Sequence, residues 1–200
     1  MKEDPYASPR SPLLPRRTVL TALSALAVSA ALPSDLLAAT PVMTGTAAPG
    51  HRPRRLKLRH LHTGERIDIA YAHGERYDHG ALAEINHFLR DHRDDTVHPI
   101  DPEVIDFLHA LAHRLKIDKP IQIICGYRSP KSNALLRARS TGVAKRSLHL
   151  EGRAIDIRVP GRSVKAVARA ALSLRRGGVG KYTKSNFVHI DCGRFRTWGA

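Results

Sequence analysis

Aromatic residues are scarce in this sequence. Phe, Trp and Tyr make up 5% of its 200 residues, and no basic stretch is interleaved with aromatic side chains. Proteins that bind single-stranded nucleic acid without sequence preference stack the bases on such side chains within a basic groove. The scarcity therefore weighs against that class of protein.

Cysteine is rarer still, because Cys125 and Cys192 are the only two. Neither has a second cysteine at CxxC spacing, which argues against a structural zinc-thiolate site. In an oxidising compartment the two could form a disulfide, but the sequence does not show whether their Cα atoms are close enough. We favour two small buried residues at the ends of strands.

The sequence also lacks a convincing membrane span. The mostly apolar run Val19–Leu32 is short and rich in Ala and Ser. It follows the pair Arg16 and Arg17 and precedes small residues, which is the order of an export signal. Because the arginine pair with Thr-Val-Leu resembles a twin-arginine signal, we expect residues 1–39 to export the folded protein to the periplasm or another extracytoplasmic space. An uncleaved N-terminal anchor is the alternative.

Acidic residues are outnumbered. The 33 Lys and Arg against 18 Asp and Glu give a formal net charge of +15. Such a surplus implies an anionic partner, which could be nucleic acid, anionic lipid or an acidic wall polymer. Since an exported protein meets wall polymers and rarely DNA, we expect no nucleic-acid partner, and a membrane contact only through an uncleaved signal. A basic nucleic-acid-binding protein is the alternative that export argues against.

Patterns of strands and helices follow the signal. Residues 40–54 have no periodicity and are typical of a linker, so the working domain is expected over residues 55–200. Alternating or continuous apolar residues predict a hairpin and three further strands, at 55–71, 121–125, 154–159 and 187–192. Apolar stripes and capping residues predict helices at 77–93, 101–116, 132–140 and 163–176. Glycines at 177–180 predict a hairpin-like loop. The order indicates an α+β fold, with a small, mostly antiparallel sheet and flanking helices.

Two stretches concentrate residues that can bind zinc. SLHLEGRAIDIR, residues 147–158, places His149 seven positions before Asp156, and FVHID, residues 187–191, adds His189. Strand alternation turns Asp156 away from the neighbouring isoleucines. Two histidines and one carboxylate can bind zinc and leave a fourth position open for water. From spacing alone, two ordinary strands with polar outer faces explain the pattern equally well.

Several motifs resemble a known family. SLHLEGRAIDI with FVHID resembles the SxHxxGxAxD and late-histidine signature of the zinc D-Ala-D-Ala peptidases, the superfamily of lysostaphin-type enzymes and hedgehog domains. Other motifs resemble its exported YcbK-like branch, the murein endopeptidase K group: HTGE at His62, LRDHR at Leu89, GYRSP at Gly126, VAKRSLH at Val143, GGVGKY at Gly177 and RTW at Arg196. The resemblance covers nearly all of residues 55–200. It implies a sheet that carries Zn²⁺ on His149, Asp156 and His189, and peptidoglycan as the substrate.

The resemblance also implies a reaction. It indicates a zinc-dependent murein peptidase, an endopeptidase rather than a carboxypeptidase, that hydrolyses cross-links or stem peptides during cell-wall remodelling. Arg128, beside Tyr127 in the loop after a strand, could donate to an oxyanion or hold a substrate carboxylate. Ser147 and Tyr127 are further candidates for substrate binding. A non-catalytic, zinc-containing peptidoglycan-binding module is the alternative.

One position departs from the superfamily pattern. Related peptidases place a general base just before the last histidine, as ExxH or HxH, whereas this chain has Asn186 and Phe187 there. Asp191 is predicted to share a face with His189 and is the nearest candidate for the catalytic base. It could instead orient His189 as a hydrogen-bond partner. Glu151 is a weaker candidate for the base.

Overall fold

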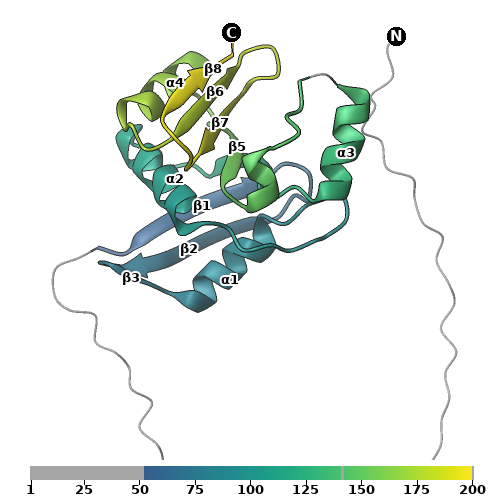
Figure 1. Cartoon of the computed structure of the whole chain (residues 1–200). Coiled ribbons are helices and arrows are strands. Elements are labelled where there is room, and N and C mark those ends of the chain that lie inside the picture. Colours follow the sequence, from purple (N-terminus) through teal and green to yellow (C-terminus); the bar gives the residue numbers. More distant parts are fainter. Residues whose placement is uncertain (1–51, 141, 200) are drawn as a thin grey trace, which may run out of the picture. The chain divides into compact units, whose positions relative to one another are not determined.

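Eight strands form one sheet in the computed structural model, which describes residues 52–140 and 142–199 (Figure 1). The strands are β1 (Arg54–His60), β2 (Arg66–His73), β3 (Arg76–Tyr77), β4 (Ile121–Cys125), β5 (Ala154–Arg158), β6 (Gly178–Tyr182), β7 (Phe187–Asp191) and β8 (Arg196–Trp198). Their order across the sheet is β3-β2-β1-β4-β5-β7-β6-β8. The β1–β4 and β6–β8 pairs are parallel, and the other five pairs are antiparallel. The sheet is therefore mixed, and it is larger than the small sheet that the sequence predicted.

Four α-helices and one 3-10 helix accompany the sheet. They are α1 (His79–Phe88), α2 (Pro102–Arg114), α3 (Pro130–Arg139), η1 (Leu148–Glu151) and α4 (Val164–Ser173). Each α-helix begins after a residue whose side chain accepts a backbone N–H of the first turn, namely Asp78, Asp101, Ser129 and Ser163. Helix α1 contacts β2, α2 contacts β1 and β7, and α4 contacts β6 and β7. The α+β class is confirmed.

The export signal and most of the linker lie outside the described residues. The first strand begins at Arg54, one residue before the expected start of the domain. No helix within residues 52–140 and 142–199 is both long enough and apolar enough to cross a membrane.

The predicted hairpin is confirmed by β1 and β2. Leu56 lies opposite Ile69 and Leu58 opposite Ile67 in the antiparallel register. Both leucines are buried, whereas Lys57 between them is exposed, as the two-residue period of a strand requires. Burial of each leucine side chain contributes about 1.5–3 kcal/mol.

Two helices end earlier than their apolar stripes predict. Helix α1 ends at Phe88 rather than near residue 93, because Asp91 accepts hydrogen bonds from the backbone N–H groups of Ser129 and Arg93. These contacts take the chain into a loop. Helix α4 ends at Ser173 rather than near residue 176, and Arg175 adopts a positive φ of 52° that no α-helix contains.

The stretch from Gly177 to Gly180, predicted to be a hairpin-like loop, runs into strand β6. A Cβ on Gly180 would lie 2.8 Å from the ring of Trp198, and one on Gly178 would lie 2.5 Å from Asp191 Oδ2. The prediction is wrong because glycine in a strand also marks the close approach of a neighbouring group.

The two faces of the central strands differ in chemistry. One face carries core side chains, all fully buried, namely Ile155 and Ile157 of β5 and Val188 and Ile190 of β7. Asp156 and His189 alternate with them and therefore point to the opposite face. Cys125, at the end of β4, and Cys192, just after β7, are free and buried, which confirms the reading that we favoured.

Candidate metal centre

The candidate site is built on a row of residues that crosses the sheet. Cys125 of β4 pairs with Asp156 of β5, Asp156 with His189 of β7, and His189 with Gly180 of β6. Gly180 in turn pairs with Trp198 of β8. Side chains directly opposite one another on neighbouring strands point to the same face. The row therefore lies on the face away from the apolar core.

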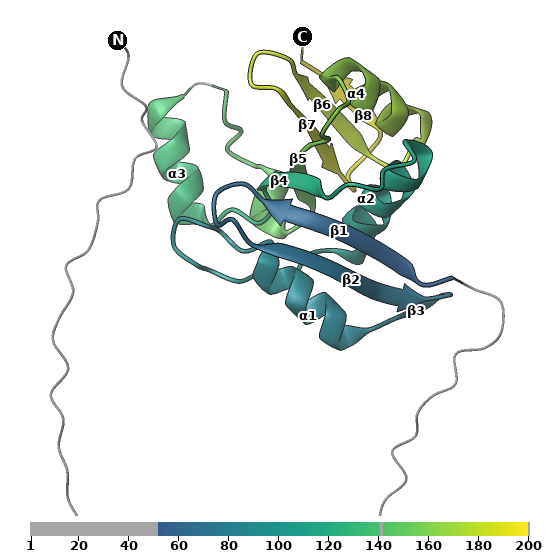
Figure 2. The same cartoon turned by 180° about the vertical axis from the view of Figure 1, so that it is seen from behind.

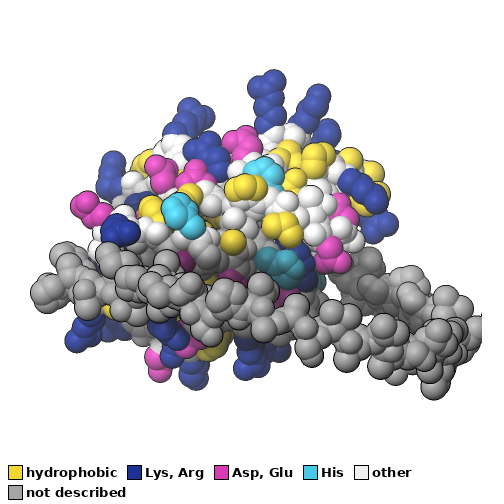
Figure 3. Space-filling view, turned by 90° about the horizontal axis from the view of Figure 1, so that it is seen from below, with side chains coloured by type: hydrophobic (Ala, Val, Ile, Leu, Met, Phe, Trp, Pro, Cys, Tyr) yellow, Lys and Arg dark blue, Asp and Glu magenta, His cyan; other side chains and the backbone are white. Residues whose placement is uncertain are grey.

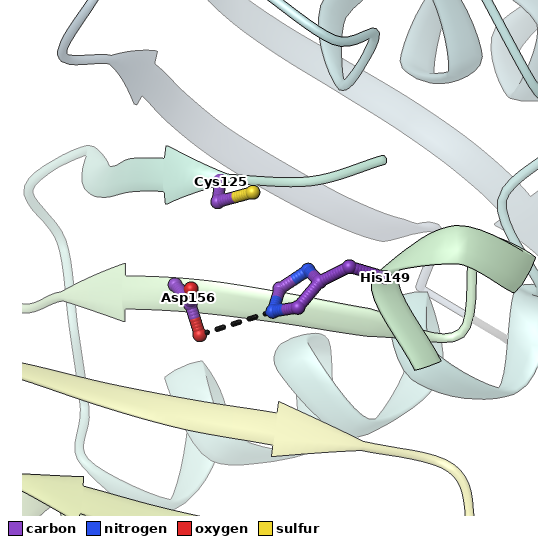
Figure 4. A group of neighbouring side chains, drawn as sticks. All are labelled: Cys125, His149 and Asp156. Atoms are coloured by element: carbon purple, nitrogen blue, oxygen red, sulfur yellow. Dashed lines mark ion pairs between the residues drawn. The ribbon is translucent and has the colours of Figure 1, made fainter. Parts of the chain in front are cut away.

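His149 reaches this row from η1. Figure 4 shows its ring directed toward Asp156, with Cys125 on the adjacent strand. Gly152 ends η1 with a φ of +66°, and a Cβ there would clash with the carbonyl oxygen of Pro99. Only glycine meets both conditions, so this residue fixes how the chain turns from η1 into β5.

Three atoms of the kind that bind metals converge at the row. His189 Nδ1 lies 2.9 Å from Asp156 Oδ1, and His149 Nε2 lies 3.3 Å from the same oxygen. The two ring nitrogens are 3.2 Å apart. All three residues are buried, with exposed fractions of 3% for His149, 6% for Asp156 and 8% for His189. The structure thus brings together the three residues that the sequence singled out as metal ligands.

Hydrogen bonds on the outer side decide which ring nitrogens face the centre. His149 Nδ1 lies 2.7 Å from the carbonyl oxygen of Gly126, which can only accept, so Nδ1–H donates and, in the neutral ring, Nε2 keeps its lone pair. His189 Nε2 lies 3.0 Å from Asp191 Oδ2, so in the neutral ring Nδ1 keeps the lone pair. When both rings are neutral, two nitrogen lone pairs and a carboxylate therefore face one another. This donor set fits a divalent cation such as zinc and leaves a position for a further ligand.

Burial and charge act in opposite directions on the pKa values at this centre. Burial lowers the pKa of His149, but the Asp156 carboxylate, with Cys125, outweighs it and raises the pKa to about 10. Burial raises the pKa of Asp156, yet His149 and His189 hold it well below its usual range. The centre therefore attracts positive charge, either as a proton or as a metal ion.

Cys125 gives a second, overlapping set of donors. Its sulfur, a nitrogen of His149 and an oxygen of Asp156 lie within 4.8 Å of one another. Burial raises the pKa of the thiol, but His149 and Arg128 lower it overall. We favour the set with His189, because its three atoms lie within 3.3 Å of one another. The sulfur instead lies 3.5 Å from the guanidinium of Arg128.

Asp191 lies behind His189 and is fully buried. It accepts five hydrogen bonds of 2.7–3.1 Å, from His189 Nε2, the backbone N–H groups of Gly178 and Gly193, and both terminal nitrogens of Arg196. Burial raises its pKa, but the bonds from His189 and Arg196 hold it well below the usual range. Of the two roles that the sequence leaves open, this geometry favours orientation of His189 over proton transfer.

Arg128 approaches the centre from the loop after β4. Its Nη2 lies 3.8 Å from Asp156 Oδ2, and its side chain is 12% exposed. Its Nε is buried and has no hydrogen-bond partner among the described residues. The backbone N–H of Arg128 donates to the carbonyl oxygen of His149 at 3.0 Å, which ties this loop to η1. A fixed cation with a spare donor therefore stands beside the proposed ligands.

Three other predicted residues lie farther out. Tyr127 is buried, and its ring stacks on that of His98 with centroids 4.6 Å apart. Ser147 is half-buried at the start of η1, and its side chain makes no capping hydrogen bond. Glu151 is exposed and pairs with Arg153 at 3.4 Å. Within the described ranges, none of the three has a hydrogen bond or ion pair with the two central histidines or Asp156.

Sequence reasoning gave no role to Trp198 or Arg196, although the RTW motif contains both. The ring of Trp198 lies 5.2 Å from that of His189, and its Nε1–H donates to the hydroxyl of Tyr182 at 2.9 Å. The guanidinium of Arg196 stacks on Trp198 while it binds Asp191. These contacts arise from the pairing register of the strands, which no local sequence pattern reveals.

Comparison with known proteins finds close relatives. Residues 48–198 match the protein family described as "Peptidoglycan L,D-endopeptidase MepK". The peptidoglycan L,D-endopeptidase MepK of Escherichia coli K12 is 45% identical over 182 residues, which are 91% of this chain and 96% of that protein. The "Probable peptidoglycan L,D-endopeptidase MepK" of Haemophilus influenzae is 40% identical over 148 residues, 74% of this chain and 80% of that protein. The solved structure of the Serratia marcescens L-Ala D-Glu endopeptidase ChiX covers 48% of this chain and 69% of its own, at 18% identity. The two structures superpose with a TM-score of 0.33.

Proposed function

The chain belongs to the MepK family of peptidoglycan L,D-endopeptidases, and we propose that it is a zinc metallopeptidase that hydrolyses peptide bonds of peptidoglycan during cell-wall remodelling. The reaction is amide hydrolysis within the peptide part of the wall polymer. The name of the relatives suggests that the scissile bond joins an L-centre to a D-centre.

One observation carries the zinc assignment, namely the convergence of His149 Nε2, Asp156 Oδ1 and His189 Nδ1 at 2.9–3.3 Å. These three atoms would hold the ion. When bound, zinc would supply a Lewis acid for the scissile carbonyl and lower the pKa of a water molecule. The chain supplies the orientation, because the carbonyl of Gly126 and the carboxylate of Asp191 fix the outer nitrogens of the two rings.

We assign Arg128 the role of stabilising the negative charge that develops during hydrolysis. Its guanidinium stands beside Asp156 and has a spare buried donor, so it can bind the oxyanion of the tetrahedral intermediate or a carboxylate of the substrate. Removal of one such donor typically lowers kcat by about 10²–10³-fold. Tyr127 and Ser147, which flank the same loop and η1, are proposed to border the bound peptide.

We assign Asp191 the role of a positioning residue. Its oxygens are occupied by five donors, and its pKa lies well below the range in which a carboxylate accepts a proton from water. Glu151 is exposed and tied to Arg153, which makes it an unsuitable base as well.

The proposed substrate also fixes where the enzyme acts. Peptidoglycan lies outside the cytoplasm, so the enzyme would act in the periplasm or an equivalent space. The twin-arginine pattern in residues 1–39 supports export of the folded domain. On this proposal peptidoglycan is the partner, and a membrane contact would require an uncleaved signal.

Muropeptide chromatography tests the proposal. Purified protein with zinc is expected to release soluble muropeptides from isolated sacculi, and a chelator should stop the release until zinc is restored. His149→Ala should release none. If instead the protein sediments with sacculi and leaves the muropeptide profile unchanged, it is a binding module and not an enzyme. Equal release by parent and His149→Ala would contradict the assigned centre.

A further inference from the structure

Between Arg128 and His149 the chain leaves the sheet and returns to it. We call residues 130–140 and 142–148 of this excursion the basic arm. It contains five basic and no acidic residues, and all five are exposed: Lys131, Arg137, Arg139, Lys145 and Arg146. The arm lies between Arg128, a substrate-binding candidate, and His149, a proposed metal ligand, and a 3.0 Å backbone hydrogen bond joins these two residues. The arm therefore stands at the edge of the metal centre.

Helix α3 forms the first half of the arm and stands apart from the sheet in both views (Figure 1, Figure 2). Its buried residues are Ser132 and Asn133, and Leu135 is 49% exposed. Asn133 Nδ2 donates to the carbonyl oxygen of Ala144 at 3.3 Å, which links the helix to the returning segment. Most of the surface of α3 is thus available to a partner.

The first turn of α3 is anchored where the arm leaves the loop. The backbone N–H of Ser129 donates to Asp91 at 2.8 Å, and its hydroxyl donates to Asp94 at 2.6 Å. Lys131 lies close enough to Asp94 to help lower the pKa of that carboxyl. The near end of the arm is therefore partly neutralised, unlike the rest.

The other four cations of the arm have no carboxylate partner of this kind. Within the described residues, Arg137, Arg139, Lys145 and Arg146 form no ion pair within 4.0 Å. Some cations elsewhere in the described residues are paired, as in Arg90 with Glu65 and Asp95. On the face seen in Figure 3, Asp and Glu side chains also lie among Lys and Arg. The arm thus combines five exposed cations with no acidic residue at the edge of the metal centre.

We propose that the basic arm binds free carboxylates of peptidoglycan stem peptides and so holds the polymer beside the metal centre. The inference rests on the proposed function, which brings stem peptides to this edge of the sheet. Stem peptides carry several carboxylates, so their charge complements that of the arm. Each exposed ion pair contributes little, but four that act on one polymer add up and are screened by salt. Leu135 offers an apolar contact on the same helix.

A structural role accounts for only part of this charge. Arg137 and Arg139 lie in the last turn of α3, where cations interact favourably with the helix dipole. Lys145 and Arg146 lie in the returning segment, outside any helix. A helix-stabilising role predicts a lower melting temperature in their absence, whereas the proposed role predicts weaker binding to the wall.

The test compares two variants of the full chain with equal charge. The arm variant carries Gln at its four unpaired cations, Arg137, Arg139, Lys145 and Arg146. The control variant carries Gln at four exposed cations on β1, β2 and α4, namely Lys57, Arg66, Lys165 and Arg169. Each variant lowers the net charge from +15 by four. Sedimentation with sacculi is measured in chelator over a series of NaCl concentrations, so that no turnover occurs.

At low salt the arm variant is expected to bind sacculi about tenfold more weakly than the parent, and its binding should depend less on salt. The control variant should lose less than about twofold. Sacculi whose carboxylates have been amidated should bind parent and arm variant equally. Equal weakening of the two variants, or an unchanged difference on amidated sacculi, would overturn the proposal.

A variant with only two substitutions, both outside α3, keeps the test valid if the arm variant unfolds this helix. Lys145→Gln with Arg146→Gln leaves the helix intact and is expected to weaken binding about threefold at an unchanged melting temperature. Binding in chelator is independent of catalysis, so the two proposals can fail separately. Muropeptide release without arm-dependent binding would refute the proposed role of the basic arm. Arm-dependent binding without muropeptide release would refute the proposed enzymatic activity.

Discussion

The carboxylate of Asp191 contacts the proposed metal centre through a single ring nitrogen, Nε2 of His189. It holds His189 Nε2 at 3.0 Å, while the opposite nitrogen faces Asp156 and His149. Arg196 binds both oxygens of Asp191, at 2.9 Å and 2.7 Å, and keeps the carboxylate ionised and fixed. A metal-ligating histidine is commonly oriented by such a partner. On this view Asp191 determines how well the centre binds zinc, and not how fast a proton is transferred.

Replacement of Asp191 by Asn separates these roles. An amide cannot accept all five hydrogen bonds, so His189 loses its fixed orientation, and zinc affinity is expected to fall about 10–100-fold. Competition with a chromophoric chelator measures this affinity. Glu151→Gln removes an exposed carboxylate as the matched control and should leave the affinity unchanged. If Asp191→Asn binds zinc like the parent but releases no muropeptides, Asp191 is the base and the orienting role is wrong.

At the scale of elements, strands β6 and β8 meet through a glycine and a tryptophan. Gly180 pairs with Trp198, whose indole occupies the space where a Cβ on Gly180 would lie, at 2.8 Å. The same indole lies beside His189 and bonds to Tyr182. The position of the Trp198 indole beside His189 therefore depends on the absence of a side chain at Gly180.

Gly180→Ala should displace Trp198. A forced shift of this kind is expected to lower the free energy of unfolding by about 1–3 kcal/mol, as overpacking does in protein cores. Urea denaturation measures the loss, and Trp198, as the one tryptophan of the chain, reports its own displacement by fluorescence. Gly142→Ala is the control, because its Cβ would meet its nearest atom at 3.7 Å. An unchanged emission spectrum in Gly180→Ala would contradict the contact.

A second junction joins the turn after β1 to the loop after α1. The rings of His62 and His92 stack with centroids 4.1 Å apart, and His60 lies 5.6 Å from His92. His60 is fully buried, and its Nδ1 accepts hydrogen bonds from the backbone N–H groups of His62 and Thr63. Burial, with the nearby His62, lowers the pKa of His60 to about 4. The junction therefore favours neutral rings.

This junction predicts acid lability. A histidine whose folded pKa lies below its unfolded value is protonated first in the unfolded state, so stability falls as the pH drops below the unfolded pKa. For His60 the loss begins near pH 6.5, is complete below about pH 4 and amounts to about 3 kcal/mol. His60→Asn keeps an acceptor near the position of Nδ1 but does not titrate. Urea denaturation at a series of pH values should show a smaller loss for this variant, and an equal loss would contradict the assignment.

At the scale of the whole molecule, local signals predicted the elements but not their arrangement. The alternation around Leu56 and Leu58, and the cap at Asp101 with Pro102 after it, are local, and the hairpin and α2 follow from them. The end of α1 depends on Asp91 binding Ser129, 38 residues away. The entry of the glycine-rich stretch into β6 depends on Trp198 in the same way. Contacts between distant residues leave no periodicity in the sequence.

The residues of the candidate site likewise fall into those that the sequence indicated and those that only the folded structure brings together. Spacing made His149, Asp156 and His189 a possible ligand set, which two ordinary strands explained equally well, and the family resemblance then assigned zinc to them. Cys125 reaches the site because β4 pairs with β5 in a register that puts it opposite Asp156. Nothing within the single strand Ile121–Cys125 indicates that partner. The donor set therefore needs a test that distinguishes His189 from Cys125.

Metal-dependent stability of the whole domain provides that test. The proposed ligands come from η1, β5 and β7, so an ion that binds them stabilises the folded chain and not the unfolded one. Free zinc at 100 times its dissociation constant should add about 2.7 kcal/mol to the free energy of unfolding. The melting temperature should therefore rise on addition of zinc to chelator-treated protein. The rise should disappear in His149→Ala and His189→Ala.

Cys125→Ala is the decisive comparison. His149 Nε2, Asp156 Oδ1 and His189 Nδ1 are complete without the thiol, so this variant should keep the zinc-dependent rise in melting temperature, even though it loses buried contacts and melts lower in chelator. The variant retains the hydrogen bond from His149 to the Gly126 carbonyl, which fixes the ring. If the rise survives in His189→Ala but is lost in Cys125→Ala, the ion binds the overlapping set of Cys125, His149 and Asp156. In that case His189 would be a hydrogen-bond partner of Asp191 and not a ligand.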